Sequence, residues 1–390
     1  MFPRLSDLIN YLCGTEIVLP AKTFGFFLAL GFVAAYIPLK AELKRREALG
    51  QFKTRKEKVM VQGPISIRDV IIHGLTWGLV GYKLGLYISD PYFFNHDTEG
   101  ALLSLRGNWW TGLLGLAGGA GWKYIAYQKR KTLQVKYKEV DAGPSFYLGT
   151  ILTIAFVAGI GGSKLFAMLE PGSHFWRDPI GDILSFNGLS FFGGLICAGF
   201  LIIYYLHRKG FHLLTSVDAF APGLTLANAV GRIGCQLSGD GDWGIVNTAP
   251  KPGFLSWMPD WLWASTYPHN VAMEGIPIPG CNPEVYAIYC RELALPVYPT
   301  PVYETIMGVA MFGFLWMIRK RMPYPGLMTG IYLILVGTER LIIERIRVNA
   351  KYDFGFLQLT QAELISMLLI LGGIAILFFR LRAKKPLETA

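Results

Sequence analysis

Residues 188–207 read GLSFFGGLICAGFLIIYYLH and residues 301–319 read PVYETIMGVAMFGFLWMIR, two long runs with hardly a charge inside them. Apolar runs of about 17–25 residues are typical of helices that cross a lipid bilayer. Further runs of this kind lie at 22–39, 67–89, 108–127, 144–168, 214–234, 326–346 and 362–381. The sequence therefore predicts an all-α fold, a polytopic integral membrane helical bundle with about nine transmembrane helices.

The composition excludes several other classes of protein. Hydrophobic residues make up 52% of the 390 residues and charged residues only 16%, against roughly 25% charged residues in soluble domains. A soluble chain of this length needs a more polar surface, and the composition fits neither a disordered chain nor a coiled coil. We therefore expect a single membrane domain over residues 1–390.

The formal net charge of +10 has a pattern along the chain. Lysine and arginine gather in alternate connections between the apolar runs, at 40–58, 129–138, 208–209, 319–321 and 380–385. Cytoplasmic loops of membrane proteins carry such an excess of positive residues. The pattern predicts an N-terminus on the periplasmic side, a cytoplasmic tail and an outer, periplasmic loop over 235–300. Positive charge placed in this way gives no reason to expect a nucleic acid partner.

The predicted outer loop contains two cysteines nine residues apart, Cys281 and Cys290. In an oxidising compartment they can form a disulfide, and two free thiols remain an equal alternative. The five cysteines of the chain form no CxxC pair, which argues against a zinc site. His73 is the one histidine placed in the core of an apolar run, where packing is its ordinary role. The sequence predicts no metal site and no cofactor.

Part of the sequence is similar to another part of it. Residues 79–90 (LVGYKLGLYISD) align with 160–171 (IGGSKLFAMLEP), so that Lys83 matches Lys164 at an offset of 81. At the same offset, 102–112 align with 183–193. Chance similarity between glycine-rich helices is the alternative, but two separated matches share one offset. We interpret 67–127 as a duplicated two-helix insertion, because internal repeats mark copied structural units.

The segment 228–244, NAVGRIGCQLSGDGDWG, has the strongest signal for chemistry. Arg232 lies between Gly231 and Gly234, and two aspartates, Asp240 and Asp242, follow it. An arginine near a membrane boundary often only extends to the interface. Glycines on both sides allow a ligand to approach closely, and a guanidinium can hold a phosphate through two hydrogen bonds.

Two further segments place charge at the ends of apolar runs. In GTERLIIERIRVN (337–349), the spacing of Arg340, Glu344 and Arg347 predicts one shared helix face. Charge at this depth usually means pairing or function, and a structural Arg340–Glu344 pair is the alternative. In YPTPVYE (298–304), Glu304 can pair with an arginine, or can simply stabilise the start of a helix.

Taken in order, these segments resemble the prolipoprotein diacylglyceryl transferase family. GRIGCQLSGDGDWG (231–244) is similar to the family signature that opens with Gly-Arg and closes with Trp-Gly, and NGLSFFGGLI (187–196) resembles another family segment. YPTPVYE and RLIIERIR (340–347) resemble two more, and the likeness covers 22–39 and about 144–382 as a transferase-like core. Members are integral bacterial inner-membrane enzymes that move the diacylglyceryl group of phosphatidylglycerol onto the lipobox cysteine of a prolipoprotein.

The resemblance implies roles for particular residues. Arg232 and Arg340 take the places of the essential arginines, Asp240 that of the signature glutamate, and Glu304 that of a family carboxylate. The expected catalytic residues are Arg232, Arg340, Asp240 and Glu304. The expected substrate-binding residues are Lys164, Gly193, Gly194, Gly231, Gly234, Ser238, Gly239, Gly244, Tyr303, Glu344 and Arg347. The expected partners are phosphatidylglycerol, prolipoprotein signal peptides with a lipobox, and membrane lipids.

The sequence also departs from the family pattern. Phe192 stands where the family usually has a histidine, Cys235 replaces the signature asparagine, and Phe24 occupies a place often held by tyrosine. Residues 67–127 have no counterpart in the usual seven-span form. The leading hypothesis is an active transferase. The alternatives are a non-catalytic relative that binds phosphatidylglycerol or lipoprotein precursors, and a transporter, since repeats and intramembrane charges also occur there.

Overall fold

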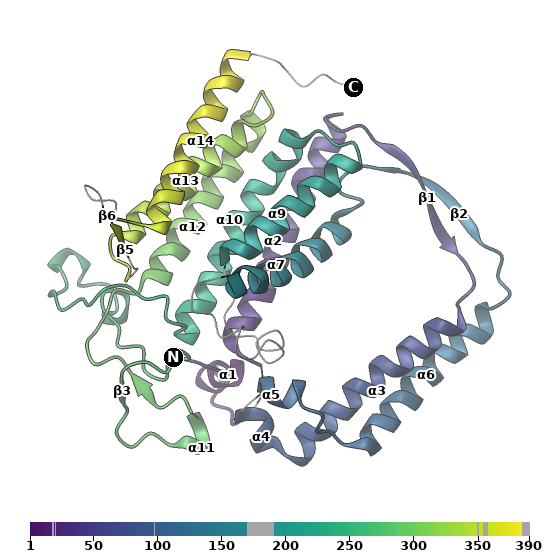
Figure 1. Cartoon of the computed structure of the whole chain (residues 1–390), viewed down its shortest axis with the longest axis horizontal. Coiled ribbons are helices and arrows are strands. Elements are labelled where there is room, and N and C mark those ends of the chain that lie inside the picture. Colours follow the sequence, from purple (N-terminus) through teal and green to yellow (C-terminus); the bar gives the residue numbers. More distant parts are fainter. Residues whose placement is uncertain are drawn as a thin grey trace. The chain divides into compact units, whose positions relative to one another are not determined.

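The computed structural model of the chain describes residues 1–383 apart from 18, 20, 97, 170–190, 287, 349–350 and 354–357. Most of these residues are helical (Figure 1). The chain forms two compact units, one of residues 1–53 with 203–390 and the other of residues 54–202. The boundary at 202/203 falls inside one helix, α9 (Phe191–Arg208).

The first unit is built around a central helix, α10. Its helices and strands are α1 (Leu5–Cys13), α2 (Thr23–Ala48), α10 (Leu213–Ser238), α12 (Thr300–Ile318), α13 (Leu327–Glu344) and α14 (Gln361–Ala383), with short elements α11 (Pro283–Tyr286), β3 (Ile276–Pro277), β4 (Arg291–Glu292), β5 (Lys351–Asp353) and β6 (Gln358–Thr360). Small residues let α10 approach its neighbours. A Cβ on Gly31 of α2 would lie 3.1 Å from the Ala227 carbonyl oxygen, and one on Gly308 of α12 would lie 2.9 Å from the Ala229 Cβ. Such contacts are typical of helices packed within membranes.

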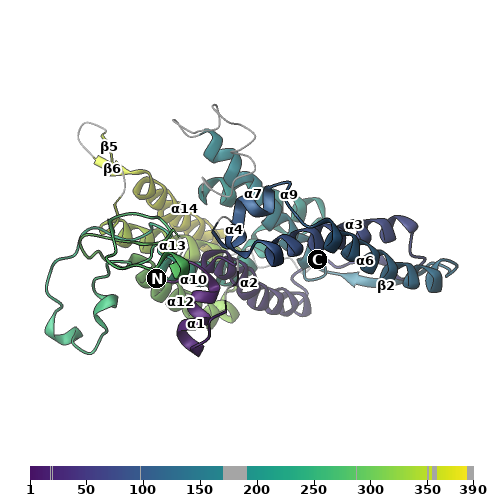
Figure 2. The ribbon, with the colours of Figure 1, turned by 90° about the horizontal axis from the view of Figure 1, so that it is seen from below.

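Helices α13 and α14 run side by side in both views (Figures 1 and 2). A Cβ on Gly373 would lie 2.6 Å from the Gly330 carbonyl oxygen, so the two backbones nearly touch there. The start of α13 is held by Asp218 of α10, whose carboxylate accepts hydrogen bonds from the Gly326 and Thr329 backbone N–H groups at 2.7 and 2.8 Å. Asp218 therefore satisfies the free N–H groups of a helix distant in sequence.

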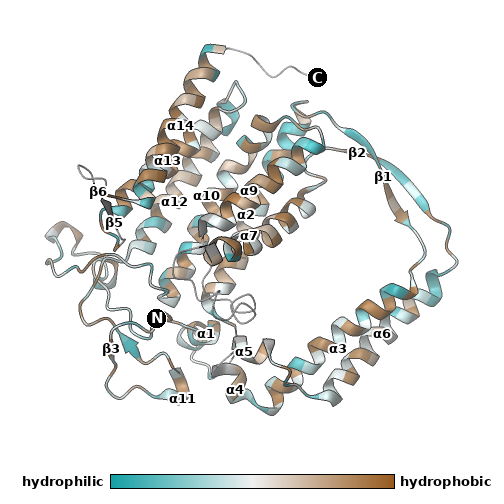
Figure 3. Ribbon diagram, in the orientation of Figure 1, coloured by the Kyte–Doolittle hydropathy of each residue, from teal (hydrophilic) through white to brown (hydrophobic). Residues whose placement is uncertain are grey.

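The second unit contains two helix pairs and a ribbon. Its elements are β1 (Arg55–Gln62), α3 (Ile67–Ser89), α4 (Pro91–His96), α5 (Thr98–Leu103), α6 (Trp109–Arg130), β2 (Lys136–Ala142), α7 (Leu148–Leu169) and the first part of α9. Strands β1 and β2 pair antiparallel, with Lys56 opposite Asp141 and Lys58 opposite Glu139. Opposite charges across strands favour this register, and the ribbon is largely hydrophilic in Figure 3 apart from the end of β1. Both strands flank α3–α6 in the sequence, so the ribbon joins that segment to the rest of the chain.

The two helix pairs of the second unit are each packed through glycines. A Cβ on Gly81 of α3 would lie 2.3 Å from the Thr111 carbonyl oxygen of α6, and one on Gly162 of α7 would lie 2.6 Å from the Gly193 carbonyl oxygen of α9. Lys83 donates to the Ala101 and Arg106 carbonyls of the connecting segment at 2.8 and 3.0 Å. Most of 183–193, which the repeat alignment uses, lies outside the described residues. The duplication stays a prediction.

Among the described residues, five helices are long and apolar enough to cross a membrane: α2, α7, α10, α12 with the turn that follows it, and α14. Helix α9 is apolar but shorter, and most of α14 has the hydrophobic colour in Figure 3. Helix α13 carries Glu339, Arg340 and Glu344, and α6 is rich in glycine, tryptophan and tyrosine taken together, which lowers their hydropathy. The protein is thus a helical membrane protein, and the count of nine crossings stays a prediction.

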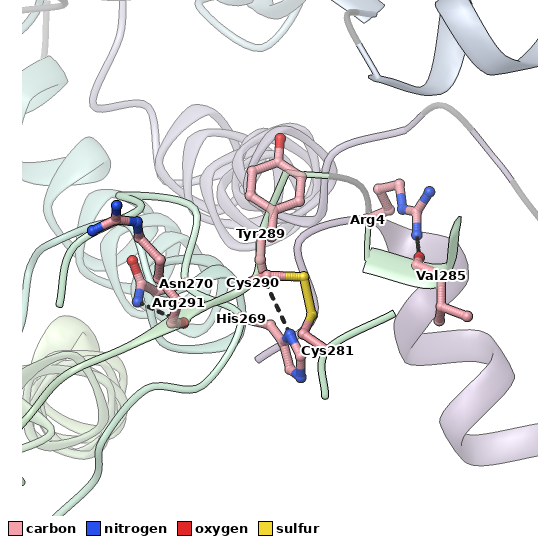
Figure 4. Close-up of a disulfide and its surroundings, with 8 residues drawn as sticks. All are labelled: Arg4, His269, Asn270, Cys281, Val285, Tyr289, Cys290 and Arg291. Carbon is pink, nitrogen blue, oxygen red and sulfur yellow. Dashed lines mark hydrogen bonds between the residues drawn. A yellow bond between two sulfur atoms is a disulfide. The ribbon is translucent and has the colours of Figure 1, made fainter. Parts of the chain in front are cut away.

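The 235–300 loop contains the disulfide that the sequence left open. Cys281 and Cys290 are bonded, with their Cα atoms 5.8 Å apart. Side chains contact the backbone near the disulfide (Figure 4). His269 Nδ1 lies 2.9 Å from the Tyr289 carbonyl oxygen, and Arg4 donates a hydrogen bond to the Val285 carbonyl. The loop therefore has a defined structure.

Candidate active site

The C-terminal turns of α10 position Arg232. The helix ends at Gly239, whose φ of 65° is the left-handed conformation that glycine adopts at helix ends. Gly234 packs against α2, where an added Cβ would lie 2.8 Å from the Phe27 Cβ, whereas no such neighbour lies within 4 Å of Gly231. Of the two glycines beside Arg232, one serves helix packing and the other faces open space.

Glu304 of α12 is the carboxylate around which three arginines gather. Its Oε2 lies 2.5 Å from Arg232 Nε, and its Oε1 lies 3.5 Å from Arg340 Nη1 and 3.4 Å from Arg347 Nη1. The Glu304 side chain is only 2% exposed. Three guanidiniums therefore converge on one buried carboxylate, and removing that carboxylate would leave them without their shared counter-charge.

Arg347 differs from its sequence prediction. Arg340 and Glu344 pair at i and i+4 on α13, with 3.2 Å between Arg340 Nη2 and Glu344 Oε2, but the helix ends at Glu344. Arg347 follows the end of the helix and pairs in extended form with Gly244. The expectation of one helix face for all three charges is therefore wrong for Arg347. Its side chain nevertheless reaches the same cluster from the loop.

Gly244 allows this loop pairing. The backbone N–H of Ile245 donates to the Ile346 carbonyl at 2.7 Å, and that of Gly244 donates to the Tyr298 carbonyl at 2.8 Å. A Cβ on residue 244 would lie 2.4 Å from the Ile346 carbonyl oxygen. The segments after α10, before α12 and after α13 meet at this point, so Gly244 brings the three chain segments of the cluster together.

The two aspartates after α10 have different roles. Asp242 forms ion pairs with both Arg232 and Arg347, whereas Asp240 accepts a long hydrogen bond (3.4 Å) from the Asp242 backbone N–H. Burial alone would raise the pKa of Asp242, but the Arg232 and Arg347 guanidiniums outweigh burial and hold that pKa below its ordinary value. Burial and the charge of Asp242 raise the pKa of Asp240. Asp242 is therefore the aspartate that interacts directly with the arginines.

The comparisons with known proteins agree with this geometry. A sequence model of the prolipoprotein diacylglyceryl transferase family matches residues 105–379. The chain belongs to this family. The matched range includes the cluster of Arg232, Asp242, Glu304, Arg340 and Arg347. It differs from the range of the sequence resemblance in two ways, because it includes α6 and does not include α2.

Individual family members show the same likeness. Proteins named phosphatidylglycerol–prolipoprotein diacylglyceryl transferase match from Chlorobaculum tepidum (28% identity, 56% of this chain and 68% of the relative) and Dehalococcoides mccartyi (29%, 64% and 83%). A protein of the same name from Thermus thermophilus matches with 30% identity over 56% of this chain and 77% of its own. Each similarity extends over most of the relative's length.

Several other predicted residues of this transferase-family chain belong to the same unit and support its structure. The Ser238 hydroxyl donates to the Gly234 carbonyl (2.8 Å), and the Tyr303 hydroxyl donates to the Leu262 carbonyl (2.9 Å). Glu344 pairs with Arg340, and Gly239 ends α10. These contacts hold the loops around the arginines, and their part in substrate binding stays a prediction.

The remaining predicted residues belong to the second unit. Gly193 and Gly194 pack against α7, where added Cβ atoms would lie 2.4 Å from the Gly162 carbonyl oxygen and 2.3 Å from the Ser163 hydroxyl. Lys164 lies on α7, and the side chain of Phe192 lies outside the described residues. Helix packing therefore accounts for both glycines, and a role for Lys164 stays a prediction.

Sequence reasoning missed part of the site. It noticed Asp242 but gave the place of the signature glutamate to Asp240, whereas Asp242 is the aspartate that pairs with the arginines. It also missed Thr300, whose hydroxyl donates to the Asp242 carbonyl at 2.6 Å, and Tyr267, whose hydroxyl donates to Gln236 at 2.7 Å. The signal in the sequence that could have identified Asp242 is that two aspartates, two residues apart, follow the signature arginine.

One group of side chains has the residue types of a metal site. Potential ligand atoms of Cys235, Asp240 and Asp242 lie within 4.8 Å of one another. Two guanidiniums already pair with Asp242, and they repel a cation at that carboxylate. A cation bound there would therefore compete with both guanidiniums for Asp242.

Proposed function

We propose that this chain transfers the diacylglyceryl group of phosphatidylglycerol to the lipobox cysteine thiol of a prolipoprotein. The observation that carries the proposal is the convergence of Arg232, Arg340 and Arg347 on Glu304. Guanidiniums hold phosphates through paired hydrogen bonds. The names of the related proteins supply the reaction and both substrates.

The chemistry requires what the arginines provide. The cysteine sulfur attacks the diacylglyceryl carbon that carries the phosphate, a C–S bond forms, the C–O bond from that carbon to the phosphate breaks, and the thiol proton passes to the released glycerol phosphate. Glycerol phosphate leaves, and negative charge grows on its oxygens. Fixed cationic donors in a low-dielectric site stabilise such charge, and one donor contributes about 3–4 kcal/mol in comparable sites. A thiol with a reference pKa near 8.5 needs little further activation.

Phosphate binding requires the arginines to exchange partners, because each already pairs with a carboxylate. Asp242 is the carboxylate suited to move, since its side chain is 32% exposed and lies in a loop. Glu304, almost fully buried on α12, stays in place and keeps the guanidiniums oriented. Arg340 has the longest contacts of the three arginines, at 3.5 and 3.2 Å. We therefore assign the first contact with the lipid phosphate to Arg340.

The membrane arrangement follows from the same proposal. The chain resides in the bacterial inner membrane, crosses it nine times, and has a periplasmic N-terminus and a cytoplasmic C-terminus. The bias of lysine and arginine along the sequence supports this orientation. The arginine cluster then lies at the periplasmic side, where the 235–300 loop and its disulfide also lie.

A transfer assay tests the proposed activity. Purified chain is mixed with glycerol-labelled phosphatidylglycerol and a lipobox peptide, and we expect the peptide to gain the mass of a diacylglyceryl group while glycerol phosphate is released. Cys235 at the asparagine position of the signature favours a second candidate, a relative that only binds the lipid. Lipid binding without a mass gain, in protein that is folded, would support this second candidate and contradict the transferase.

A further inference from the structure

A second charged cluster lies at the opposite end of the same helices. Glu42 of α2 is 1% exposed and pairs with Arg45 (2.5 Å), Arg46 (2.8 Å) and Arg319 (3.4 Å). Along α10, Asp218 precedes Arg232 by fourteen residues, which is about 21 Å of helix. The Glu42 cluster is therefore separate from the arginine site.

A cavity of about 70 Å³ opens beside Glu42 and its partners. Its polar lining comes from Arg45, Arg46, Gln51, Asp218, Arg319 and Lys320. A water needs roughly 10–15 Å³ of such space, so the cavity has room for several waters or one tetrahedral anion. Met322 and the exposed Leu49 also line it, so the polar cavity adjoins apolar surface.

The charges of the cavity do not balance. Arg45, Arg46, Arg319 and Lys320 contribute four positive charges, whereas Glu42 and Asp218 supply two negative ones. Asp218 is already occupied by the start of α13 and lies 3.9 Å from Arg46. The buried Nε of Arg319 lies 3.4 Å from a carboxylate oxygen of Glu42 but makes no hydrogen bond to it. An anion in the cavity would supply further negative charge beside Arg319 and Lys320.

We propose that this cavity binds the phosphate group of an anionic phospholipid, as a second lipid site remote from the transfer reaction. Basic pockets between membrane helices recognise such headgroups, and two or more guanidiniums can hold one phosphate. The apolar rim at Leu49 and Met322 places the site next to lipid chains. Free inorganic phosphate has the same chemistry and is the other source to distinguish.

Photo-crosslinking from the rim of the cavity detects lipid bound there and does not detect lipid bound at the arginine site. Leu49 is replaced by a photoreactive phenylalanine analogue in the full chain, which is placed in nanodiscs of phosphatidylcholine with a minority of phosphatidylglycerol. We expect adducts enriched in phosphatidylglycerol over its share of the lipid. Arg319→Gln and Lys320→Gln should each lower the enrichment, by up to about tenfold. Arg208→Gln, an exposed arginine outside the cavity, should not change it.

The outcomes separate the two sources and the failure of the proposal. In one outcome, inorganic phosphate added to the nanodiscs abolishes the enrichment in the wild-type chain and has a smaller effect in Arg319→Gln. That result would support a phosphate-binding site and identify free phosphate, not the lipid, as its ligand. Adducts in proportion to the lipid mixture, unchanged in both cavity variants, overturn the proposal. Lys320 is exposed, so Lys320→Gln keeps the test valid if Arg319→Gln fails to fold.

Discussion

Glu304 Oε2 and Arg232 Nε lie 2.5 Å apart, joining the second turn of α12 to the last turns of α10. The two residues are 72 positions apart in the sequence. Glu304 also contacts Arg340 and Arg347, so it orients every arginine of the proposed phosphate site. In this arrangement one buried carboxylate fixes the geometry, and we propose that substrate displaces the partly exposed Asp242.

Replacing Glu304 by glutamine should destabilise the protein strongly. Three guanidiniums would lose their shared counter-charge, and breaking a buried pair from one side typically costs about 3–5 kcal/mol. Asp260→Asn is the matched control, because Asp260 pairs with Lys251 but is 95% exposed, and such surface pairs contribute little. Thermal unfolding in detergent measures both. Equal midpoints for the two variants would show that Glu304 has no structural role.

Asp242 and Asp240 should respond to pH in opposite ways. The lowered pKa of Asp242 means that its charged form stabilises the folded state above the unfolded pKa near 3.9, and that this contribution disappears as pH falls through the folded value. The raised pKa of Asp240 means that its charge opposes folding at neutral pH. Asp242→Asn should therefore lower stability at pH 7, and Asp240→Asn should not.

Measuring unfolding midpoints from pH 7 down to pH 3 checks both statements. The Asp242→Asn protein should lose less stability than wild type over this range, because it lacks the group that becomes protonated. A steeper acid loss in Asp242→Asn than in wild type would contradict the assignment of Asp242 as the partner of the arginines.

The sequence predicted the helices well and the site only in outline. The nine apolar runs correspond to α2, α3, α6, α7, α9, α10, α12, α13 and α14, because a long apolar run is itself a signal for a helix of membrane-spanning length. Periodicity placed Arg340 and Glu344 on one helix face but could not reveal that α13 ends at Glu344. The position of Arg347 depends on backbone pairing with Gly244, a contact across 103 positions that no local pattern encodes.

The choice between Asp240 and Asp242 shows the same limit. Both follow the signature arginine closely, and only the path of the loop after Gly239 decides which carboxylate turns toward Arg232. That path is fixed by Thr300, which holds the Asp242 carbonyl from another helix. Asp218 of α10 makes another contact of this kind, because its carboxylate accepts from the backbone N–H groups at the start of α13.

Labelling of single cysteines tests the predicted orientation. Cys13, Cys197 and Cys235 are the free thiols of the described structure and are replaced by serine, and the disulfide is kept. Probes are placed at Leu49 and Met273, both exposed. An impermeant reagent added from outside should label position 273 and spare position 49, as the charge bias predicts. Labelling of position 49 and not of position 273 would contradict this orientation and indicate the opposite one.

Lys83 should be dispensable for chemistry although it holds the segment between α4 and α6. Its ammonium donates to the Ala101 and Arg106 carbonyls, and the duplicated segment carries no arginine equivalent to Arg232 or Arg340. Lys83→Ala should therefore unfold at lower temperature and transfer at a rate close to wild type. Loss of turnover with normal expression, stability and lipid binding would show that the inserted helix pair takes part in the reaction.

Lysine in place of Arg232 or Arg340 tests the phosphate clamp itself. Lysine keeps the charge but loses the planar fork that binds phosphate through two hydrogen bonds. Each variant should therefore lose transfer by about a hundredfold or more, as removal of one fixed donor does in other sites. Arg208→Lys, on the exposed end of α9, should transfer at the wild-type rate. If the two arginines only extended to the membrane interface, lysine would serve equally well. Wild-type rates in both variants, with unchanged unfolding temperatures, would therefore refute the clamp and leave Arg347 as the remaining arginine of the cluster to test.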